Sequence, residues 1–574
     1  MKERLYSKIP LAQTIVHLCD IKGIHHIVIS PGSRNAPLTI GFSEHPGLQC
    51  YSIVDERCAA FFALGLAQQL QQPVALVCTS GSALLNYYPA IAEAFYSDIP
   101  LVVLSADRPI ERIDIGDGQT IRQRNVFENH ILYSANLYSE LIAAEQITDK
   151  RILQKQKEAQ KHNEREINLA LNTSIEQQGP VHINVPFYEP LYDKIKASTV
   201  NPQVLPIENH TYSLQDFAQD DIIEQWNNAE KKLILIGTNT PDSIDSKYFD
   251  LLAKDPSVLV LTETTSNIYH HTHIDSIDQL ITSLNPEEFL ALQPDILVTI
   301  GGMVVSKRIK AFLRNFSPGT HWHIDEKKAF DTYFCLDYHV KMNPEAFLSE
   351  VLSLTKTVTS KYKEQWLAVR ELRRKQHKKY LLDIPFSDLR VFEVLISNMP
   401  KIQQLQLSNS STIRYAQLFE LSPGLQVFCN RGTSGIDGST STAIGAAIAS
   451  ELPTTLITGD LSFFYDSNAL WNDYLPNSFR IIVINNGGGG IFRILPGKSD
   501  DYNFNTYFET THSLSADHLC KMYGIEYHQA KSLSDTNKVL NSFYKPSDQP
   551  KLLEIFTPRL VNDEVLIDYF KHLV

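Results

Sequence analysis

The chain alternates short apolar runs with segments of helical periodicity along most of its length. In the first third, β-branched runs such as HHIVIS, PVALVCTSG and IPLVVLSADRP are separated by amphipathic stretches such as RCAAFFALGLAQQL. Two later blocks repeat the pattern, from KKLILIG to THWHIDE and from IQQLQLSNSS to PKLLEIF. Strands that alternate with helices indicate parallel βαβ units. We therefore expect an α/β protein with three doubly wound parallel-sheet domains.

The apolar pattern also suggests where the domains begin and end. A chain of 574 residues is longer than one core can serve, so several domains are expected. We assign residues 1–190 to the first domain and the proline-containing, weakly periodic residues 191–213 to a linker. A central Rossmann-like domain follows over residues 214–355. The charged helical stretch SKYKEQWLAVRELRRKQHKKY leads into the third domain, residues 356–574.

Polar residues directly after the predicted strands are candidates for function, because open parallel sheets bind ligands beyond the carboxyl ends of their strands. These positions hold many groups that bind anions, and one conspicuous glutamate. They are Ser33-Arg34, Asp55-Glu56-Arg57, Thr79 to Ser82, Asp107-Arg108, Ser408 to Ser410, Arg431-Gly432, Gly459-Asp460 and Asn485-Asn486.

The stretch from TTLITGD to RIIVINNGGGG suggests a metal site. We interpret the two apolar runs as neighbouring parallel strands joined by a helix over SNALWNDYL, so that Asp460 and Asn486 meet at one edge of the sheet. Carboxylate, amide and carbonyl oxygens suit magnesium or calcium, and magnesium usually shares its shell with phosphates. The glycines 487–490 allow close approach of the backbone to a ligand. Either dipeptide alone would be typical of a turn.

Composition and charge exclude several classes of function. The formal net charge of −13 disfavours a general nucleic-acid binder, so arginine clusters must serve local purposes. The apolar runs are too short to span a bilayer and the N-terminus lacks a cleavable leader, so we expect a cytoplasmic protein. The seven cysteines form no CxxC pair, which disfavours zinc and disulfides and predicts buried thiols.

The spacing of Gly-Asp and Asn-Asn resembles the metal–diphosphate motif of thiamin-diphosphate enzymes. The segments SPGSRNAPL, VDERCAAFFALGLA, SADRP, SKR, NRGTSGIDGSTSTAIG and NNGGGGIF resemble, in order along the whole chain, one branch of that family. That branch makes 2-succinyl-5-enolpyruvyl-6-hydroxy-3-cyclohexene-1-carboxylate in menaquinone biosynthesis. The resemblance implies a transferase, active as a homodimer or a dimer of dimers, with thiamin diphosphate and Mg²⁺ or Mn²⁺. It would decarboxylate 2-oxoglutarate and add the succinyl carbanion to isochorismate.

The resemblance also assigns residues to the cofactor. Glu56, contributed across a subunit interface, would be the catalytic carboxyl that hydrogen-bonds the aminopyrimidine ring, although an acid at a helix start needs no such role. The cofactor-binding residues would be Glu56, Ser410, Ile436, Asp460, Leu461, Ser462 and Asn486, with metal ligands Asp460, Asn486 and Gly488. Gly487 replaces a third asparagine of the family, which leaves Asn485 as the alternative to Asn486. Cys58 stands where a small residue is usual.

Both implied substrates are dicarboxylates, which explains a need for arginine and lysine in spite of the acidic composition. The resemblance assigns cations, neutral donors and an apolar wall to this site. The substrate-binding residues would be Ser33, Arg34, Arg108, Gln119, Lys307, Arg308, Ser410, Arg414, Arg431, Ile491, Phe492 and Leu495. Lys307 and Arg308 have an alternative interpretation as the start of an exposed helix.

Three other functions stay open at this point. Another thiamin-diphosphate-dependent 2-keto acid decarboxylase or lyase would need fewer cations for carboxylates. A nicotinamide dehydrogenase could use the central domain, but KKLILIGTNTPDS and PDILVTIGG lack the GxGxxG fingerprint. A scaffold without catalysis is disfavoured because Glu56, Asp460 and Asn486 are all present.

Overall fold

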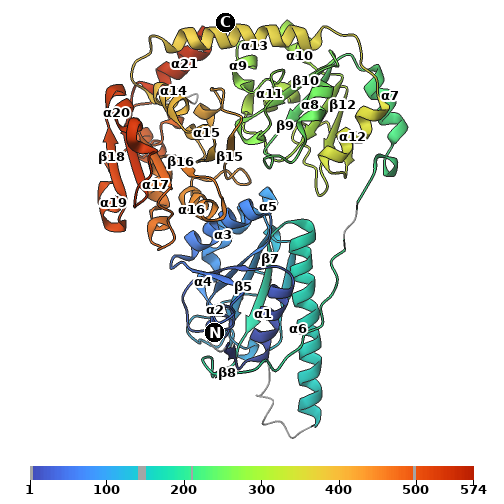
Figure 1. Cartoon of the computed structure of the whole chain (residues 1–574), viewed down its shortest axis with the longest axis vertical. Coiled ribbons are helices and arrows are strands. Elements are labelled where there is room, and N and C mark those ends of the chain that lie inside the picture. The colour runs from blue at the N-terminus through green and yellow to red at the C-terminus, as the bar shows by residue number, and fades with distance from the viewer. Residues whose placement is uncertain (1–3, 140–149, 209–210, 495–498) are drawn as a thin grey trace. The chain divides into compact units, whose positions relative to one another are not determined.

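The structure is a computed structural model that describes residues 4–139, 150–208, 211–494 and 499–574 (Figure 1). It confirms the predicted fold class, because three parallel sheets with flanking helices account for most of the chain. The chain forms two compact units. Unit 1 comprises Met1–Asn209, Gly432–Thr454 and Ser462–Phe479, and unit 2 comprises His210–Arg431, Thr455–Leu461 and Arg480–Val574. The predicted boundaries of the three domains stay a prediction.

Unit 1 is built on a six-stranded sheet of order β3-β2-β4-β5-β7-β6, in which neighbouring strands are parallel. The strands are β2 (His26–Ile29), β3 (Gln49–Ser52), β4 (Val74–Cys78), β5 (Leu101–Asp107), β6 (Tyr133–Asn136) and β7 (Val181–Pro186). The helices are α1 (Pro10–Ile21), α2 (Ala36–Ser43), α3 (Glu56–Leu70), α4 (Ser82–Asn86), α5 (Tyr88–Ser97), α6 (Lys150–Gln177) and α16 (Ser439–Ala449). Central strands β4 and β5 are buried along their whole length, as expected for a sheet covered on both faces.

Helices α3 and α16 pack backbone to backbone within unit 1. A Cβ at Gly65 would lie 2.0 Å from the carbonyl oxygen of Thr442, and a Cβ at Gly445 would lie 2.0 Å from that of Phe62. Any side chain at either glycine would therefore force the helices apart. Because α3 begins at Glu56, this crossing fixes the helix that presents the predicted catalytic carboxyl.

Part of the predicted linker has structure of its own. Strand β8 (Lys194–Ile195) pairs antiparallel with β1 (Tyr6–Ser7). Further along, Asn168 of α6 donates to the carbonyl of Gln203 and accepts from the backbone of Leu205. The linker therefore runs along the surface of unit 1 as far as residue 208. These hydrogen bonds hold it there, although its sequence has no helical or strand periodicity.

Unit 2 contains the central sheet, a five-stranded parallel sheet of order β10-β9-β11-β12-β13. Its strands are β9 (Lys232–Ile236), β10 (Val258–Thr262), β11 (Ile296–Ile300), β12 (Thr320–Ile324) and β13 (Tyr338–Val340). Its helices are α7 (Gln219–Asn228), α8 (Ser246–Leu252), α9 (Ile277–Ile281), α10 (Pro286–Leu292), α11 (Lys307–Asn315) and α12 (Pro344–Leu354). Two separate apolar clusters include alternate residues of β9 and β11, so both faces of this sheet are covered.

The second sheet of unit 2 has the order β15-β14-β16-β17-β19-β18. Its strands are β14 (Gln403–Leu407), β15 (Leu425–Phe428), β16 (Thr454–Gly459), β17 (Arg480–Asn485), β18 (Glu526–Ala530) and β19 (Lys551–Phe556). The helices of this part are α13 (Tyr362–Leu381), α14 (Asp388–Asn398), α15 (Ser411–Ala416), α17 (Asp460–Tyr465), α18 (Ile491–Ile494), α19 (Asp517–Tyr523), α20 (Leu533–Phe543) and α21 (Asn562–His572). The strand order reverses between β14 and β16, which is where open α/β sheets bind ligands.

Two details of the sequence prediction need correction. The helix expected over SNALWNDYL is absent from the described structure: α17 begins at Asp460 itself, and Ser467–Leu470 form only a 3₁₀ turn. The Asp466 carboxylate before this segment accepts from Ser441 and makes no capping hydrogen bond, and the backbone leaves helical geometry at Trp471 (φ −84°, ψ 68°). All seven cysteines are free thiols as expected, but Cys50 and Cys335 are only half-buried. Among the helices that the structure describes, none is long and apolar enough to cross a membrane.

Candidate cofactor and substrate site

Asp460 and the glycine turn after β17 come together at the edge of the sheet, as the sequence predicts. Strands β16 and β17 are parallel neighbours, with Gly459 opposite Ile484. The Asp460 carboxylate accepts hydrogen bonds from the backbone N–H groups of Gly487 (2.9 Å) and Gly488 (3.0 Å). His512 lies beside it, with Nε2 3.3 Å from Oδ2. The carboxylate is therefore buried and fixed over the turn.

The two asparagines of this turn are used differently. The Asn485 side chain is fully engaged, because its Nδ2 donates to Leu514 and Glu554 and its Oδ1 accepts from Gly487. The Asn486 Nδ2 donates to the Asp388 carboxylate (3.0 Å), which leaves Oδ1 buried without a hydrogen-bond partner in the described structure. A buried acceptor without a partner is costly, and a cation would satisfy it. Of the two asparagines, Asn486 is therefore the one whose side-chain oxygen has no hydrogen-bond partner among the described residues.

Asp388 orients Asn486 from a distant part of the chain. Its carboxylate also accepts from the Thr557 hydroxyl (2.6 Å), and it stands at the start of α14. Burial raises the pKa of Asp388 to about 6, and the nearby charge of Asp460 adds to the rise. Positive charge at the turn would oppose both effects.

Glu56 occupies the first turn of α3, as predicted. The helix is capped by Asp55, whose side chain accepts from the backbone N–H groups of Arg57 (3.0 Å) and Cys58 (3.3 Å). Asp55 also accepts from Asn468 (2.8 Å), and Arg57 donates to the carbonyl of Tyr465 (2.9 Å). These contacts in unit 1 fix the helix start, while the Glu56 side chain stays partly exposed.

Unit 1 holds two predicted substrate arginines, Arg34 and Arg108, which lie near enough for the charge of one to act on the other. The buried Arg34 donates to the Phe187 carbonyl and to Glu189, and its Nε has no hydrogen-bond partner among the described residues. Arg108 donates to the Ser80 hydroxyl (2.6 Å) and to the carbonyl of Gln119 (2.8 Å). Burial and the neighbouring charge of Arg34 lower the pKa of Arg108. Two guanidinium groups that approach each other in this way create a place for an anion.

The predicted neutral donors of this group are less constrained. Ser33 and Gln119 are exposed, and the contact of Gln119 with Arg108 uses its backbone and not its side chain. Gln119 has a φ of 55°, an uncommon backbone conformation for a residue other than glycine. The structure places both residues in the predicted loops, and among the described residues neither side chain has a hydrogen bond that would indicate a role.

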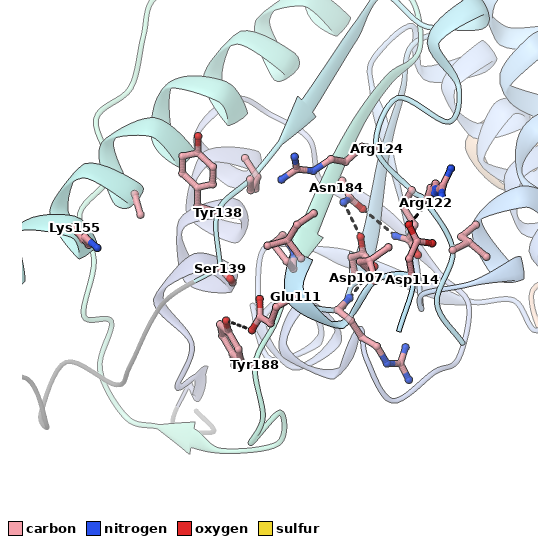
Figure 2. Close-up of a pocket in the computed structure, with 18 of the residues that line it drawn as sticks. Asp107, Glu111, Asp114, Arg122, Arg124, Tyr138, Ser139, Lys155, Asn184 and Tyr188 are labelled. Atoms are coloured by element: carbon pink, nitrogen blue, oxygen red, sulfur yellow. Dashed lines mark hydrogen bonds and ion pairs between the residues drawn. The ribbon is translucent and has the colours of Figure 1, made fainter. Parts of the chain in front are cut away.

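Figure 2 shows a cavity of about 700 Å³ in unit 1, beside the loop that follows β5. Its described wall carries equal numbers of acidic and basic side chains, including the Asp114–Arg122 pair and the hydrogen-bonded Glu111 and Tyr188. Arg108 is the single predicted substrate residue among the described residues of the wall. Since the cavity has no excess of positive charge, we do not assign the dicarboxylate site to it.

A second group of predicted substrate cations gathers in unit 2, at the carboxyl ends of β14 and β15. Arg431 donates to Asn409 (2.7 Å), and burial together with the like charge of Arg431 lowers the pKa of Arg414. The Arg414 Nε is buried and has no hydrogen-bond partner in the described parts of the chain. Ser410, the residue directly before α15, has a φ of 68° and a ψ of −125°, a combination that costs energy and is common at functional sites.

The central sheet contributes Lys307 and Arg308 to the same unit. Both begin α11, which agrees with the helix-start interpretation, and both are exposed. The loop before them is fixed by the buried Glu263, which accepts from the backbone N–H groups of Val305 (2.6 Å) and Ser306 (2.7 Å). Burial raises the pKa of Glu263 to about 7.

Asp278 completes this arrangement. It accepts from the Ser306 hydroxyl; burial raises the pKa of Asp278, while the charges of Arg308 and Arg414 lower it. Arg308 lies on α11, beside the central sheet, and Arg414 lies on α15, beside the second sheet of unit 2. Both are close enough to influence one carboxyl group. The structure therefore brings Arg308, Arg414 and Arg431 into one region of unit 2.

The loop with the predicted wedge residue Ile436 is anchored in unit 1. The Ile436 side chain is 39% exposed, and its carbonyl accepts from the Ser462 hydroxyl (2.6 Å). Upstream, Glu93 of α5 accepts from the backbone of Gly432 and Thr433, both at 2.7 Å. An exposed isoleucine in a hydrogen-bonded loop is not part of a core, which argues against the packing alternative for Ile436.

The predicted apolar wall is partly described. Ile491 and Phe492 begin α18 directly after the glycine run, and the Phe492 ring contacts Phe508 with centroids 6.2 Å apart. Both side chains are half-exposed and so are available to a ligand. Leu495, the third predicted member, lies outside the described residues. Leu461 donates its backbone N–H to Asp460 (2.7 Å), and this contact fixes the start of α17.

Comparisons with known proteins settle the family. Residues 9–135 match the N-terminal TPP binding domain of thiamine pyrophosphate enzymes, residues 202–407 the middle domain, and residues 410–555 the C-terminal TPP binding domain. The chain is 60% identical to a 2-succinyl-5-enolpyruvyl-6-hydroxy-3-cyclohexene-1-carboxylate synthase of Christiangramia forsetii, over 99% of both chains. The chain belongs to this synthase family. Proteins of that name from Flavobacterium johnsoniae (55% identical over 99% and 100%) and Bacteroides thetaiotaomicron (36% over 99% and 100%) agree.

Membership in the synthase family makes the chain an enzyme that uses thiamin diphosphate, and it removes the nicotinamide and scaffold alternatives. The central sheet lies within the match to the middle domain of such enzymes. The family match does not by itself assign individual residues, so their roles rest on the geometry described above.

Proposed function

We propose that the chain joins a succinyl unit from 2-oxoglutarate to isochorismate, with release of carbon dioxide, to form 2-succinyl-5-enolpyruvyl-6-hydroxy-3-cyclohexene-1-carboxylate. The gathering of Arg308, Arg414 and Arg431 in unit 2 carries this proposal. A simple 2-keto acid decarboxylase has one substrate carboxylate to bind near its reacting carbon, whereas this reaction has two dicarboxylates. Arginine pairs well with carboxylates because it offers two parallel donors.

The residues present fit thiamin diphosphate and a divalent metal. Asp460, Asn486 Oδ1 and the Gly488 carbonyl would hold Mg²⁺ or Mn²⁺, since hard oxygen ligands suit these ions. The buried, unpartnered Asn486 Oδ1 supports this assignment. One carboxylate among these ligands leaves half of the charge of the divalent ion to be balanced by the diphosphate. Ser410, Leu461 and Ser462 would add polar contacts to the cofactor.

Thiamin diphosphate, when bound, supplies the electron sink that 2-keto acid decarboxylation requires. Glu56 would hydrogen-bond the aminopyrimidine ring nitrogen and so favour the tautomer that removes a proton. Ile436 would hold the cofactor in its bent form. An apolar wall of Ile491, Phe492 and Leu495 would exclude water from the reacting atoms. The same low polarity would favour loss of the charged carboxylate as carbon dioxide.

The cations would divide between binding and orientation. Arg34 and Arg108 in unit 1 would bind one carboxylate, with Ser33 and Gln119 as neutral donors. Lys307, Arg308, Arg414 and Arg431 in unit 2 would bind others, with Ser410 as a neutral donor. Asn409 positions Arg431, and Glu263 and Asp278 position the loop of Lys307 and Arg308.

We further infer a cytoplasmic homodimer, or a dimer of dimers, in which Glu56 of one chain completes the site that contains Asp460 of the other. The family resemblance supports this arrangement. A twofold axis would then create two equivalent sites at one interface.

A product assay tests the proposal. Purified protein is mixed with thiamin diphosphate, Mg²⁺, 2-oxoglutarate and isochorismate, and the product is identified by its mass. The expected product appears only with both substrates present. Carbon dioxide release at an equal rate without isochorismate, and no joined product, would instead indicate another thiamin-diphosphate-dependent decarboxylase or lyase.

A further inference from the structure

We propose that Glu509 and Arg493 form a brace that holds the glycine turn of the metal site and the apolar segment Ile491–Phe492 in one fixed arrangement, and so act as positioning residues for the reaction. The inference rests on the proposed function, because that function gives the turn and the apolar segment their roles. Neither Glu509 nor Arg493 stood out in the sequence.

The side chains form a buried two-point ion pair. Arg493 Nε donates to Glu509 Oε1 (2.7 Å) and Arg493 Nη2 donates to Oε2 (2.5 Å). The side chains are 5% and 0% exposed. Two parallel hydrogen bonds fix direction as well as distance, which a single contact cannot do. Since Arg493 lies on α18 directly after Phe492, the pair fixes the orientation of that short helix.

The backbone of Glu509 binds the other end of the same segment. Its carbonyl oxygen accepts from the N–H of Gly489 at 2.6 Å. A Cβ on Gly488 would lie 2.7 Å from this oxygen, so the carbonyl packs directly against the turn. Gly488 in turn donates its N–H to Asp460. One residue therefore holds both ends of residues 488–493, and the metal site and apolar wall cannot move independently.

Surrounding groups support the brace. Arg559 Nη1 donates to Glu509 Oε2 (2.7 Å), and Asp500 accepts from Arg493 Nη1 (2.9 Å). The Arg493 guanidinium also lies over the Phe504 ring, 5.5 Å from its centroid. Glu509 thus keeps a cationic partner if Arg493 is changed, which makes variants at Arg493 suitable for experiment.

The burial of this pair is better explained by position than by stability. Removing two charges from water costs about as much as their attraction returns, and apolar residues of similar size often replace such pairs without loss of stability. An apolar pair would fill the space but would not fix the angle of α18. A positioning role and a merely structural contact therefore predict different results when the ion pair is replaced by apolar residues.

The test compares Arg493→Lys, Glu509→Gln and the double variant Arg493→Met/Glu509→Met with the wild type. Hydrogen exchange of residues 486–494, measured by mass spectrometry on the cofactor-free protein, should become faster in all three. Mg²⁺-dependent affinity for thiamin diphosphate should fall roughly tenfold or more, as for other groups that orient metal ligands. With both substrates present, a larger share of 2-oxoglutarate should end as succinic semialdehyde, because a loosened wall admits the proton donor water.

Asp500→Asn is the matched control, since it removes an outer partner of Arg493 whose side chain is 73% exposed. It should change cofactor affinity by less than about twofold. The proposal is overturned if the double variant is folded and its exchange, affinity and product ratio all match the wild type. It is also overturned if Arg493→Lys melts earlier with unchanged exchange of residues 486–494. If the wild type makes no joined product, the proposed function fails, while exchange and affinity still decide on the brace.

Discussion

The carboxylate of Glu93 lies 2.7 Å from the backbone nitrogen of Gly432 and accepts its hydrogen bond. A Cβ on Gly432 would lie 2.6 Å from the Glu93 carbonyl oxygen, so the loop can approach α5 this closely only with glycine. The carboxylate also accepts from the N–H and hydroxyl of Thr433 and from Ser97. All of these contacts converge on the two carboxylate oxygens. Glu93 therefore sets the start of the loop that leads to Ile436.

Glu93→Gln should destabilise the protein by about 2 kcal/mol, because an amide nitrogen would face donor groups in a buried place. Urea unfolding measures the loss. Glu158→Gln, an exposed change in the same unit, should leave the stability within about 0.5 kcal/mol of the wild type. Equal effects of the two changes would show that the Glu93 contacts contribute little.

Glu56→Gln should nearly abolish turnover while thiamin diphosphate still binds, because an amide cannot support the aminopyrimidine tautomer in the same way. Steady-state kinetics and calorimetric titration measure the two effects separately. Near-normal turnover would remove Glu56 from its proposed catalytic role.

The asparagines allow a direct comparison at the metal site. Asp460→Ala should lose Mg²⁺-dependent binding of thiamin diphosphate, since the metal loses the one anionic ligand of the proposed set. Asn486→Ala should weaken binding more than fivefold, a conservative expectation for the loss of one metal ligand. Asn485→Ala should act mainly on stability, because its side chain bonds Leu514 and Glu554. The reverse order of cofactor affinities in the two asparagine variants would exchange their roles.

Mixing two inactive chains tests the proposed dimer. Glu56→Gln and Asp460→Ala chains should regain activity when combined, because one site of each mixed dimer would hold Glu56 from one chain and Asp460 from the other. With random exchange about half of the dimers are mixed, each with one intact site, so recovery can approach roughly a quarter of the wild-type activity. No recovery after proven exchange of the chains would place both residues of a site in one chain.

Asp466 should make stability depend on pH. It is fully buried in unit 1 and accepts from the Ser441 backbone (2.7 Å) and hydroxyl (2.9 Å). Burial raises the pKa of Asp466 from its ordinary value near 3.8 to about 6. The folded chain therefore holds this proton more tightly than the unfolded chain.

The contribution of Asp466 is complete below pH 3.8 and is lost as the pH rises through about 6. Over this range the wild type should lose on the order of 3 kcal/mol relative to Asp466→Asn, which carries no titrating group. Urea unfolding at a series of pH values measures the difference between the two proteins. A difference that does not change with pH would show that the pKa of Asp466 is not raised on folding.

The sequence predicts best those residues whose place depends on local pattern. Asp460 and Asn486 follow strands, and parallel strands deliver their ends to one edge, so their approach to each other could be inferred. Glu93 can also be recognised in the sequence as a buried acid, since it lies on the apolar side of the helical stretch AIAEAF. A buried acid on such a helix requires partners.

Other residues gave no local signal. Asp388 and Glu509 reach the metal turn through contacts that join distant parts of the chain, and nothing in their own surroundings indicates these contacts. Similarly, the helix predicted over SNALWNDYL was wrong, and the Asp466 side chain, which could have capped it, instead bonds Ser441 of α16. Tertiary contacts decided these positions, and a pattern within one segment cannot contain them.

The proposed metal site has a single carboxylate, Asp460, and this has a consequence for how the protein would bind its cofactor and metal. The bound ion keeps positive charge that the diphosphate can balance, so binding of the ion and binding of the cofactor should each raise the affinity for the other by the same factor. A chelator would then release the vitamin cofactor, and a shortage of the vitamin would release the ion. The occupancy of the turn would therefore depend on the supply of the metal ion and of thiamin diphosphate together.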